Sequence, residues 1–274
     1  MNNKYRELML RKESQGEAVL RLTEIMKILR VECPWDRIQT HQTLTTCMIE
    51  EAYEVVDAIN RENTADLREE LGDVLLQVVF HSELSDEEGN FNLIDVTNDV
   101  CDKMIRRHPH IFYEEDGKSI DKVLERWENI KSEEHGETTY TQRLEAVPKN
   151  FPALMRSAKV QKRGREAGFD RNKTGEPLDR VADKLKEFSS VFEREDRDRI
   201  EGELGNLLFY IVNLSVSAGV NPETALNRAT DEFTDRFSEM EDKVRKSGHS
   251  MRDMDSNSLE DLWRETGNRF RADN

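Results

Sequence analysis

The chain repeats one pattern of acidic and apolar residues at a constant spacing, which restricts the folds open to it. EEAYE (Glu50–Glu54) and EELGDVLL (Glu69–Leu76) in the first half correspond to DKLKE (Asp183–Glu187) and GELGNLLF (Gly202–Phe209) in the second. Four pairs of positions share one offset, because 183 − 50, 187 − 54, 203 − 70 and 206 − 73 all equal 133. Such regularity indicates a duplicated structural unit. The duplication predicts an N-terminal repeat, a polar linker and a C-terminal repeat at 1–131, 132–149 and 150–274.

Apolar residues recur at helical spacing within both repeats. Six prolines and 13 glycines are few for 274 residues, and no long run alternates apolar with polar residues as a strand does. VLLQVVF (Val74–Phe80) alone would suit a strand, but it continues a segment of helical spacing without a turn signal. We therefore predict an all-α fold of two tandem helical bundles. The predicted helices cover roughly 14–30, 43–60, 65–84, 94–108, 120–134, 152–166, 177–193, 197–217, 222–245 and 258–267.

The composition argues against several classes of partner. Lys and Arg total 41 against 57 Asp and Glu, so the net charge is −16, whereas a nucleic-acid-binding protein needs a basic face. Nucleotide substrates remain compatible with this charge, because a bound divalent cation inverts it locally. We expect no membrane span and no signal peptide, since long apolar runs are missing and the N-terminus is polar. Three cysteines without a CxxC pair favour a reducing cytoplasm.

Carboxylates gather beside the apolar faces of two successive predicted helices. On the first helix, three acids lie next to the apolar stripe: Glu50, Glu51 and Glu54. The second helix becomes apolar nearly all round, and one polar strip remains, made of Glu70, Asp73 and Gln77. The predicted core stripes are Met48, Ala52, Val55, Val56 and Ile59 on the first helix and Leu67, Leu71, Val74, Leu75 and Val78 on the second.

These two groups of acids predict a metal site. A short connection favours antiparallel packing of the helices, so that Glu51 and Glu54 can face Glu70 and Asp73. Converging carboxylates repel one another and raise each other's pKa, and a hard divalent cation relieves the repulsion. Mg²⁺ takes oxygen ligands and completes its shell with water and substrate phosphate. The alternative is a solvated acidic face, which explains a lone EExxE better than two acid pairs on adjacent helices.

Basic and aromatic residues near these helices have both functional and structural interpretations. Lys103 and Arg107 are spaced i, i+4 and suit phosphate oxygens, but they also complement the dipole of a helix C-terminus. In CPWD, Trp35 and Asp36 suit a base or a sugar, whereas Trp35 could equally anchor the loop to the core. HPH (His108–His110) marks a helix end rather than a transition-metal site, since no third soft ligand accompanies it.

Together these segments resemble the MazG family of nucleoside triphosphate pyrophosphohydrolases in its tandem-repeat form. The resemblance extends over nearly the whole chain, and its specific signature is EExxE followed at a distance by ExxD. The matching segments are CPWDRIQTH, EEAYE, REELGDVLLQVVFH, DKMIRRHPHIF, ERWENIK and, in the second half, KVQKRGREAGFD.

The resemblance implies a helical bundle that forms homodimers and hydrolyses nucleoside triphosphates to monophosphate and pyrophosphate, as a housecleaning enzyme of the nucleotide pool. The catalytic set that it implies is Glu50, Glu51, Glu54, Glu70 and Asp73. All of these except Glu50 would hold Mg²⁺, and Glu50 would orient or deprotonate the attacking water. The substrate contacts that it implies are Lys103 and Arg107 on the phosphates and Trp35 and Asp36 near the nucleoside.

The second repeat departs from this pattern at the acidic positions. Asp183 and Lys184 stand where the first repeat has Glu50 and Glu51, and Asn206 replaces Asp73. Glu187 and Glu203 remain as acids in the second repeat. Of the basic pair, Arg236 matches Arg107, whereas Glu232 aligns with Lys103. Because Lys184 brings a positive charge to the place of a cation, we predict that this repeat binds Mg²⁺ poorly and is structural or regulatory.

Other functions fit parts of the same pattern. A non-catalytic helical module that docks on a nucleotide-responsive partner would keep the fold without turnover. An enzyme restricted to pyrimidine or damaged nucleotides would keep the chemistry with a narrower substrate range. An acidic helical scaffold would leave Glu70 and Asp73 on an otherwise apolar helix unexplained.

Overall fold

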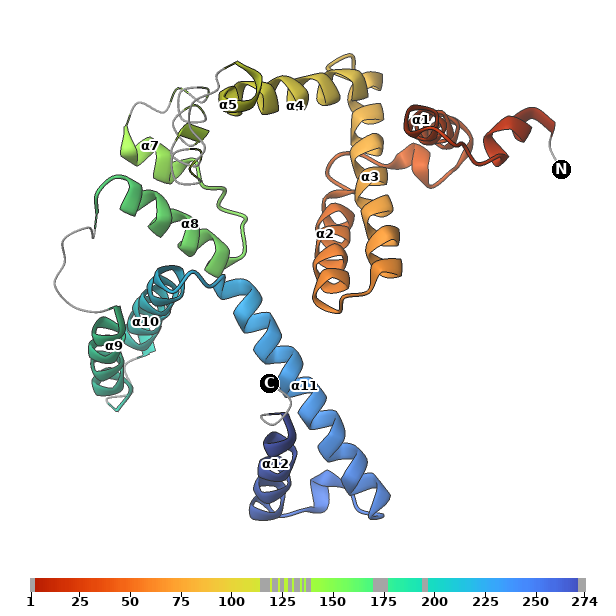
Figure 1. The fold of residues 1–274 in the computed structure, drawn as a ribbon. Helices are drawn as coiled ribbons and strands as arrows, with labels where there is room; N and C mark the ends of the chain where they lie inside the picture. Colours follow the sequence, from red (N-terminus) through yellow and green to blue (C-terminus); the bar gives the residue numbers. More distant parts are fainter. Residues whose placement is uncertain are drawn as a thin grey trace. The chain divides into compact units, whose positions relative to one another are not determined.

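The computed structural model describes residues 3–113, 139–169, 177–193 and 197–270, together with the isolated positions 119, 123, 126, 127, 130, 134 and 136. Within these residues the chain consists of helices, turns and bends without a strand, which confirms the all-α prediction. The chain divides into two compact units, Met1–Lys131 and Ser132–Asn274 (Figure 1). The predicted helix at 120–134 lies outside the described residues, apart from five of these positions.

Three helices of the first unit, α1, α3 and α4, begin after residues whose side chains cap them. Ser14 accepts a hydrogen bond from the backbone of Glu17 at the start of α1, and Asn92 forms a capping box with Asp95 at the start of α4. Val74–Phe80 lies inside one long helix, as predicted. The elements are η1 (Asn3–Met9), α1 (Gln15–Glu32), η2 (Asp36–Ile38), α2 (Thr45–Asn60), α3 (Thr64–Glu87), α4 (Leu93–Arg107) and α5 (Pro109–Phe112).

A tight turn joins α2 to α3 and makes them antiparallel (Figure 1). Glu62 occupies the left-handed region with φ of 53°. Asn63 then caps α3 by accepting hydrogen bonds from the backbone of Ala65 and Asp66 at 3.0 and 3.3 Å. Across the turn, Arg61 pairs with Asp57 at 2.5 Å and with Asp66 at 3.3 Å. The residues of this turn therefore hold α2 and α3 antiparallel, and the acids of α2 lie opposite those of α3.

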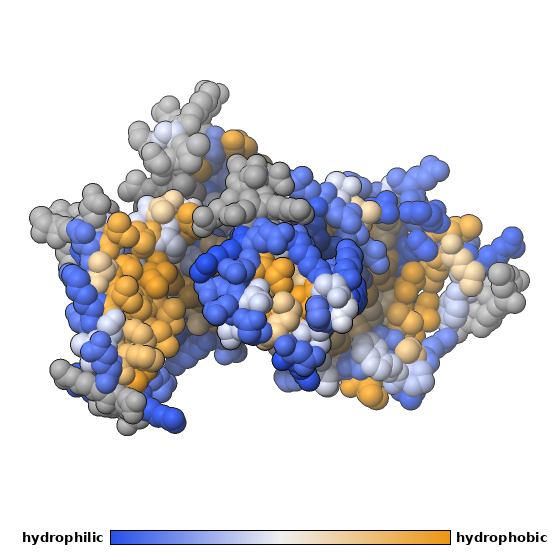
Figure 2. Space-filling view, turned by 90° about the horizontal axis from the view of Figure 1, so that it is seen from below, coloured by the Kyte–Doolittle hydropathy of each residue, from blue (hydrophilic) through white to orange (hydrophobic). Residues whose placement is uncertain are grey.

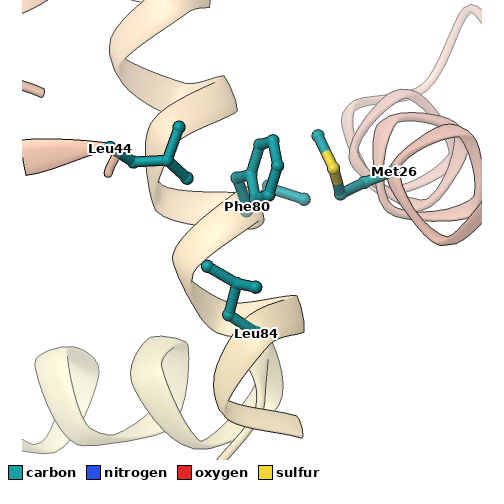
Figure 3. Packing of buried hydrophobic residues seen from close by; sticks show 5 residues of the cluster. Met26, Leu44, Phe80 and Leu84 are labelled. Atoms are coloured by element: carbon teal, nitrogen blue, oxygen red, sulfur yellow. The ribbon is translucent and has the colours of Figure 1, made fainter. Parts of the chain in front are cut away.

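The core of the first unit lies at the C-terminal half of α3. Phe80 packs between Met26 of α1 and Leu44 before α2, with Leu84 one turn further along (Figure 3). By contrast, the apolar stripe predicted for the hairpin is only partly covered within one chain: Val56, Ile59, Leu71 and Leu75 are 41%, 54%, 52% and 41% exposed. The reason is geometric. The helix α1 and the loop before α2 pack against the C-terminal half of α3. The N-terminal half of α3 packs against α2 on one side, and its other sides are left uncovered by the residues that the structure describes.

A histidine pair ties the loop before α2 to α3. The rings of His41 and His81 stack with centroids 5.0 Å apart, and their Nδ1 atoms are 2.7 Å apart. The other ring nitrogen of His41 lies 3.2 Å from the hydroxyl of Ser85. Partial burial lowers the pKa of His81, and the charge of His41 lowers it further. The lowered pKa of His81 favours its neutral form in this contact.

The second unit repeats the helical hairpin of the first. Its helices α9 and α10 pack against each other, and the carbonyl oxygen of Phe209 accepts a hydrogen bond of 2.8 Å from Gln161 of α8. Within the segment predicted as a linker, Thr139 caps a short helix and Val147 is buried. The elements are α7 (Tyr140–Glu145), α8 (Ala153–Glu166), α9 (Pro177–Phe192), α10 (Arg197–Ser217), α11 (Pro222–Lys246), η3 (Met251–Asp253) and α12 (Ser256–Phe270).

The second hairpin also leaves apolar surface uncovered. Figure 2 shows a hydrophobic area at the left, where Figure 1 places α9 and α10. The residues that are more than two-fifths exposed on these helices include Leu185, Phe192, Leu204, Leu208 and Phe209. Among the described residues, no single helix is long and apolar enough to cross a membrane, and only α10 with α11, bent by 103°, meets those criteria as a pair.

Replacing Phe80 with alanine should destabilise the first unit by about 3–5 kcal/mol, because the change leaves a cavity among Met26, Leu44 and Leu84. Phe91→Ala is the matched control, since Phe91 is 45% exposed and its loss should cost under about 1 kcal/mol. Urea unfolding followed by circular dichroism measures both. Equal effects of the two changes would contradict the core assigned to α3.

Candidate metal centre

Three carboxylates from the two antiparallel helices converge in the first unit. Glu51 lies on α2, and Glu70 and Asp73 lie one turn apart on α3. One carboxylate oxygen from each residue lies within 4.8 Å of the others, and all three side chains are half-buried. Among the described residues, this is the one group of three or more potential ligands that could hold a metal ion.

The carboxylates destabilise one another's charged forms. Partial burial raises the pKa of Glu51, and the negative charges of Asp73 and Glu54 raise it further. Partial burial likewise raises the pKa of Glu70, with Glu54 and Asp73 as the next causes. Glu54 is therefore close enough to act on both residues, although it lies outside the tightest group. Glu50 is exposed on α2 and adds a smaller repulsion to Glu51.

The chemistry of this donor set fits a hard divalent cation. All three converging donors are carboxylate oxygens, without histidine or cysteine, and such ligands suit Mg²⁺ or Mn²⁺ rather than Zn²⁺. Their partial exposure leaves room for water and substrate oxygens in the same coordination shell. The site therefore combines an uncompensated negative charge with the ligand type that a magnesium ion requires.

Gln77 continues the polar strip of α3 beyond Asp73. Its side chain is 6% exposed, and its carbonyl oxygen Oε1 lacks a hydrogen-bond partner in the structure. A buried acceptor left without a donor costs free energy, and a donor from outside the chain would remove that cost. Gln77 lies four residues, or one turn, from Asp73, which leaves an acceptor available next to the carboxylates.

Arg30 holds the loop that carries Trp35 and Asp36. Its guanidinium forms a two-pronged pair with Glu87 at the end of α3, with distances of 2.8 and 2.6 Å, and lowers the pKa of that carboxyl. The same guanidinium donates to the backbone carbonyl of Asp36. Asp36 is buried, whereas Trp35 is 56% exposed, so the indole does not anchor the loop to the core.

The predicted phosphate-binding residues lie on a helix that leads away from the hairpin. α4 starts beyond the far end of α3 and extends from it (Figure 1), so that one chain does not bring Lys103 and Arg107 to the carboxylates. Arg107 is 8% exposed, and its guanidinium lies 5.2 Å from the ring centre of Trp127. The helix ends at Arg107, as the HPH motif predicts.

A separate groove of about 480 Å³ lies between α1, α3 and α4. Apolar side chains such as Leu20 and Ile94 line it together with Glu83, and it includes none of the predicted site residues. It lies apart from the converging carboxylates of Glu51, Glu70 and Asp73, and its described residues form no comparable metal site.

The fold and the site define an all-α protein with a carboxylate centre suited to a divalent cation. Comparison with known proteins agrees with this class. Residues 39–112 match the model of the MazG nucleotide pyrophosphohydrolase domain. The chain belongs to the MazG family, which confirms the resemblance seen in its sequence.

The relatives match most of the chain. The nucleoside triphosphate pyrophosphohydrolase of Escherichia coli K12 is 40% identical over 250 residues, which is 89% of this chain and 95% of the relative. The nucleoside triphosphate pyrophosphohydrolase/pyrophosphatase MazG of Thermotoga maritima is 39% identical over 88% of this chain and 92% of its own length. A crystal structure of a mazG-related protein from Thermotoga maritima is 26% identical and covers 41% of this chain and 98% of its own, with a TM-score of 0.37.

Without divalent metal, the contribution of Glu51 to the stability of the first unit should fall as pH rises above the ordinary glutamate pKa of 4.5, because the native state binds a proton on Glu51 more tightly than the unfolded chain does. Glu51→Gln removes this contribution, so that the variant should gain stability over wild type as pH rises and should be the more stable metal-free protein at neutral pH. Thermal unfolding in EDTA across pH measures the difference, with the exposed Glu24→Gln as control. Parallel curves for wild type and Glu51→Gln would contradict the repulsion.

Proposed function

We propose that this chain hydrolyses nucleoside triphosphates to nucleoside monophosphate and pyrophosphate, and that its first unit holds the Mg²⁺ ions required. The observation that carries the proposal is the convergence of Glu51, Glu70 and Asp73 within a domain of the MazG family. The relatives in Escherichia coli and Thermotoga maritima carry names that state this activity. The assigned role is housecleaning of the nucleotide pool.

The reaction is an in-line attack of water on the α-phosphorus, with pyrophosphate as the leaving group. The metal ligands are Glu51, Glu54, Glu70 and Asp73, and Mg²⁺ bound there would supply positive charge for the phosphate oxygens and lower the pKa of a bound water. Glu50 holds the attacking water and accepts its proton. Because the sequence contains no P-loop, phosphate binding relies on the carboxylate-held cation and on Lys103 and Arg107.

The nucleoside is assigned to the residues around the η2 loop. The exposed ring of Trp35 is available for stacking on a base. Asp36 accepts hydrogen bonds from the base or the sugar, and Arg30 holds its backbone in place. Gln77 offers its unpaired Oε1 to a donor one turn from Asp73.

Two copies of the chain are proposed to form a dimer through the first hairpin. The half-exposed residues Val56, Ile59, Leu71 and Leu75 form an apolar surface on α2 and α3 that one chain leaves open. A second hairpin packed on it would complete a four-helix bundle. Because α4 extends away from its own hairpin, it would extend toward the other copy in such a dimer. Lys103 and Arg107 of one copy would then lie near the carboxylates of the other.

The dimer predicts a mass of twice 32.0 kDa in solution. Ile59→Glu should weaken the association by at least about tenfold, because it buries a charge in the apolar contact. Val31→Glu on α1 is the control, since Val31 is 71% exposed and lies outside the hairpin. Sedimentation velocity over a range of concentrations measures both. A monomeric wild type would contradict the dimer.

The remaining assignments follow the composition. With a net charge of −16, the chain is not expected to bind nucleic acid. All three cysteines are free, which suits a reducing cytoplasm, and we propose that location.

Product analysis tests the function directly. Incubation with ATP and Mg²⁺ should give AMP and pyrophosphate, whereas ADP and phosphate would contradict the cleavage site. Absence of turnover with every nucleoside triphosphate, combined with a stable complex with another protein, would favour the non-catalytic module instead. Relative kcat/KM across nucleotides separates a general enzyme from one restricted to pyrimidine or damaged nucleotides.

Two substitutions locate the active unit in the same assay. Asp73→Asn should lower kcat/KM by about 100-fold or more, because it removes one anionic ligand without changing the side-chain shape. Glu187→Gln in the second unit should leave kcat/KM within about twofold, since Glu187 lies in the other unit and pairs with Lys184. The reverse outcome would move catalysis to the second unit.

A further inference from the structure

The second unit keeps two acids of the metal centre and changes the other two positions. Glu187 on α9 and Glu203 on α10 lie 133 positions after Glu54 and Glu70. Lys184 stands 133 positions after Glu51, and Asn206 the same distance after Asp73. The first set carries four negative charges, and the second carries two negative charges and one positive charge. Repulsion between like charges therefore dominates at these positions in the first hairpin, whereas the second hairpin has a positive charge beside its acids.

The side chain of Lys184 pairs with an acid of its own helix, α9, and its ammonium faces an aromatic ring of α10. Its Nζ lies 2.6 Å from Oε2 of Glu187 on the same helix and 5.7 Å from the ring centre of Tyr210 on α10. The lysine side chain is 25% exposed, so its aliphatic part lies against the hairpin rather than in solvent. The hydrogen bond with Glu187 raises the pKa of Lys184, and the charge of Glu203 contributes in the same direction.

Asn206 has an amide donor at the position where Asp73 of the first unit has a carboxylate acceptor. Its amide nitrogen Nδ2 lies 3.5 Å from Oε2 of Glu203. In the first unit, the corresponding Asp73 adds a negative charge to the group and raises the pKa of Glu51. In the second unit, both remaining acids thus have a donor within the same hairpin, and the described residues there contain no group of three ligands for a metal.

We propose that the ammonium group of Lys184 is the permanent cation of the second hairpin, and that with Asn206 it replaces the divalent ion which the first hairpin requires. The second unit accordingly keeps the charge of its acids balanced at any concentration of Mg²⁺, through Lys184 beside Glu187 on α9 and Asn206 beside Glu203 on α10. It is a metal-independent unit, and its remaining acids are committed to Lys184 and Asn206 rather than to a metal or a nucleotide. This inference concerns the second unit alone and does not depend on the catalytic activity of the first.

The number of Mn²⁺ ions bound by the 274-residue chain tests this proposal. Electron paramagnetic resonance of the unbound Mn²⁺ measures that number. Glu187→Gln combined with Glu203→Gln should leave the number of bound Mn²⁺ ions unchanged. Lys184→Glu combined with Asn206→Asp should add about one Mn²⁺ per chain, because it restores the carboxylates of the first centre. Lys186→Glu is the matched control, since Lys186 pairs with Asp183 at 3.0 Å while both are mostly exposed.

A loss of Mn²⁺ in the glutamine variant would overturn the proposal, because it would place a metal on acids assigned to Lys184. No gain in the Lys184→Glu, Asn206→Asp variant, with its helical circular dichroism intact, would overturn it as well. These readouts are independent of turnover, so they remain informative whether or not the first unit proves catalytic.

A second variant covers the case in which the double change prevents folding. Lys184→Met leaves Glu187 and Glu203 without their cation and should lower the melting temperature by roughly 2–4 °C, whereas Lys186→Met should have little effect. Mg²⁺ should restore more of the loss in Lys184→Met than it adds to wild type. Equal melting temperatures and equal responses to Mg²⁺ for wild type and Lys184→Met would overturn the proposal.

Discussion

The repulsion between acids on α2 and α3 is the constraint around which the first unit is organised. The turn at Glu62 and the cap at Asn63 hold the two helices antiparallel, so that Glu51 cannot avoid Glu70 and Asp73. The raised pKa values of Glu51 and Glu70 express the cost of this arrangement. A cation bound there would remove that cost, and under the proposed function it would also supply positive charge for the phosphates of the substrate. The repulsion among the carboxylates and the proposed binding of a cation are therefore two aspects of one interaction.

Local features of the fold were predictable from the sequence because they depend on neighbours in the chain. Helical spacing predicted α2 and α3 within a few residues, and it placed Val74–Phe80 in a helix despite the β-branched composition of that segment. A short connection between amphipathic helices leaves antiparallel packing as the natural arrangement. The proximity of Glu51, Glu70 and Asp73 follows from those two facts.

Features that depend on long-range contacts were not predictable in the same way. The sequence does not show that the stripe at Leu71 and Leu75 stays half-exposed in one chain, because burial depends on how far α1 and α4 extend over the hairpin. The stacking of His41 on His81 joins residues 40 positions apart, and no local pattern in the sequence predicts it. The position of α4 relative to the acids likewise depends on tertiary packing.

Comparison of the two hairpins shows why a duplicated site diverges as it does. A group of acids that lacks its cation lowers the stability of the helices that carry it, and this cost is retained only where the chemistry requires the charge. Once one copy supplies the reaction, the other gains stability from any change that neutralises its acids. Lysine at position 184 does this with a single side chain, because its ammonium reaches the carboxylate of Glu187 at 2.6 Å while its stem lies along the helix. In the first unit, a lysine at position 51 would put a fixed ammonium in the place proposed for the divalent ion, and the proposed reaction would lose its exchangeable cation.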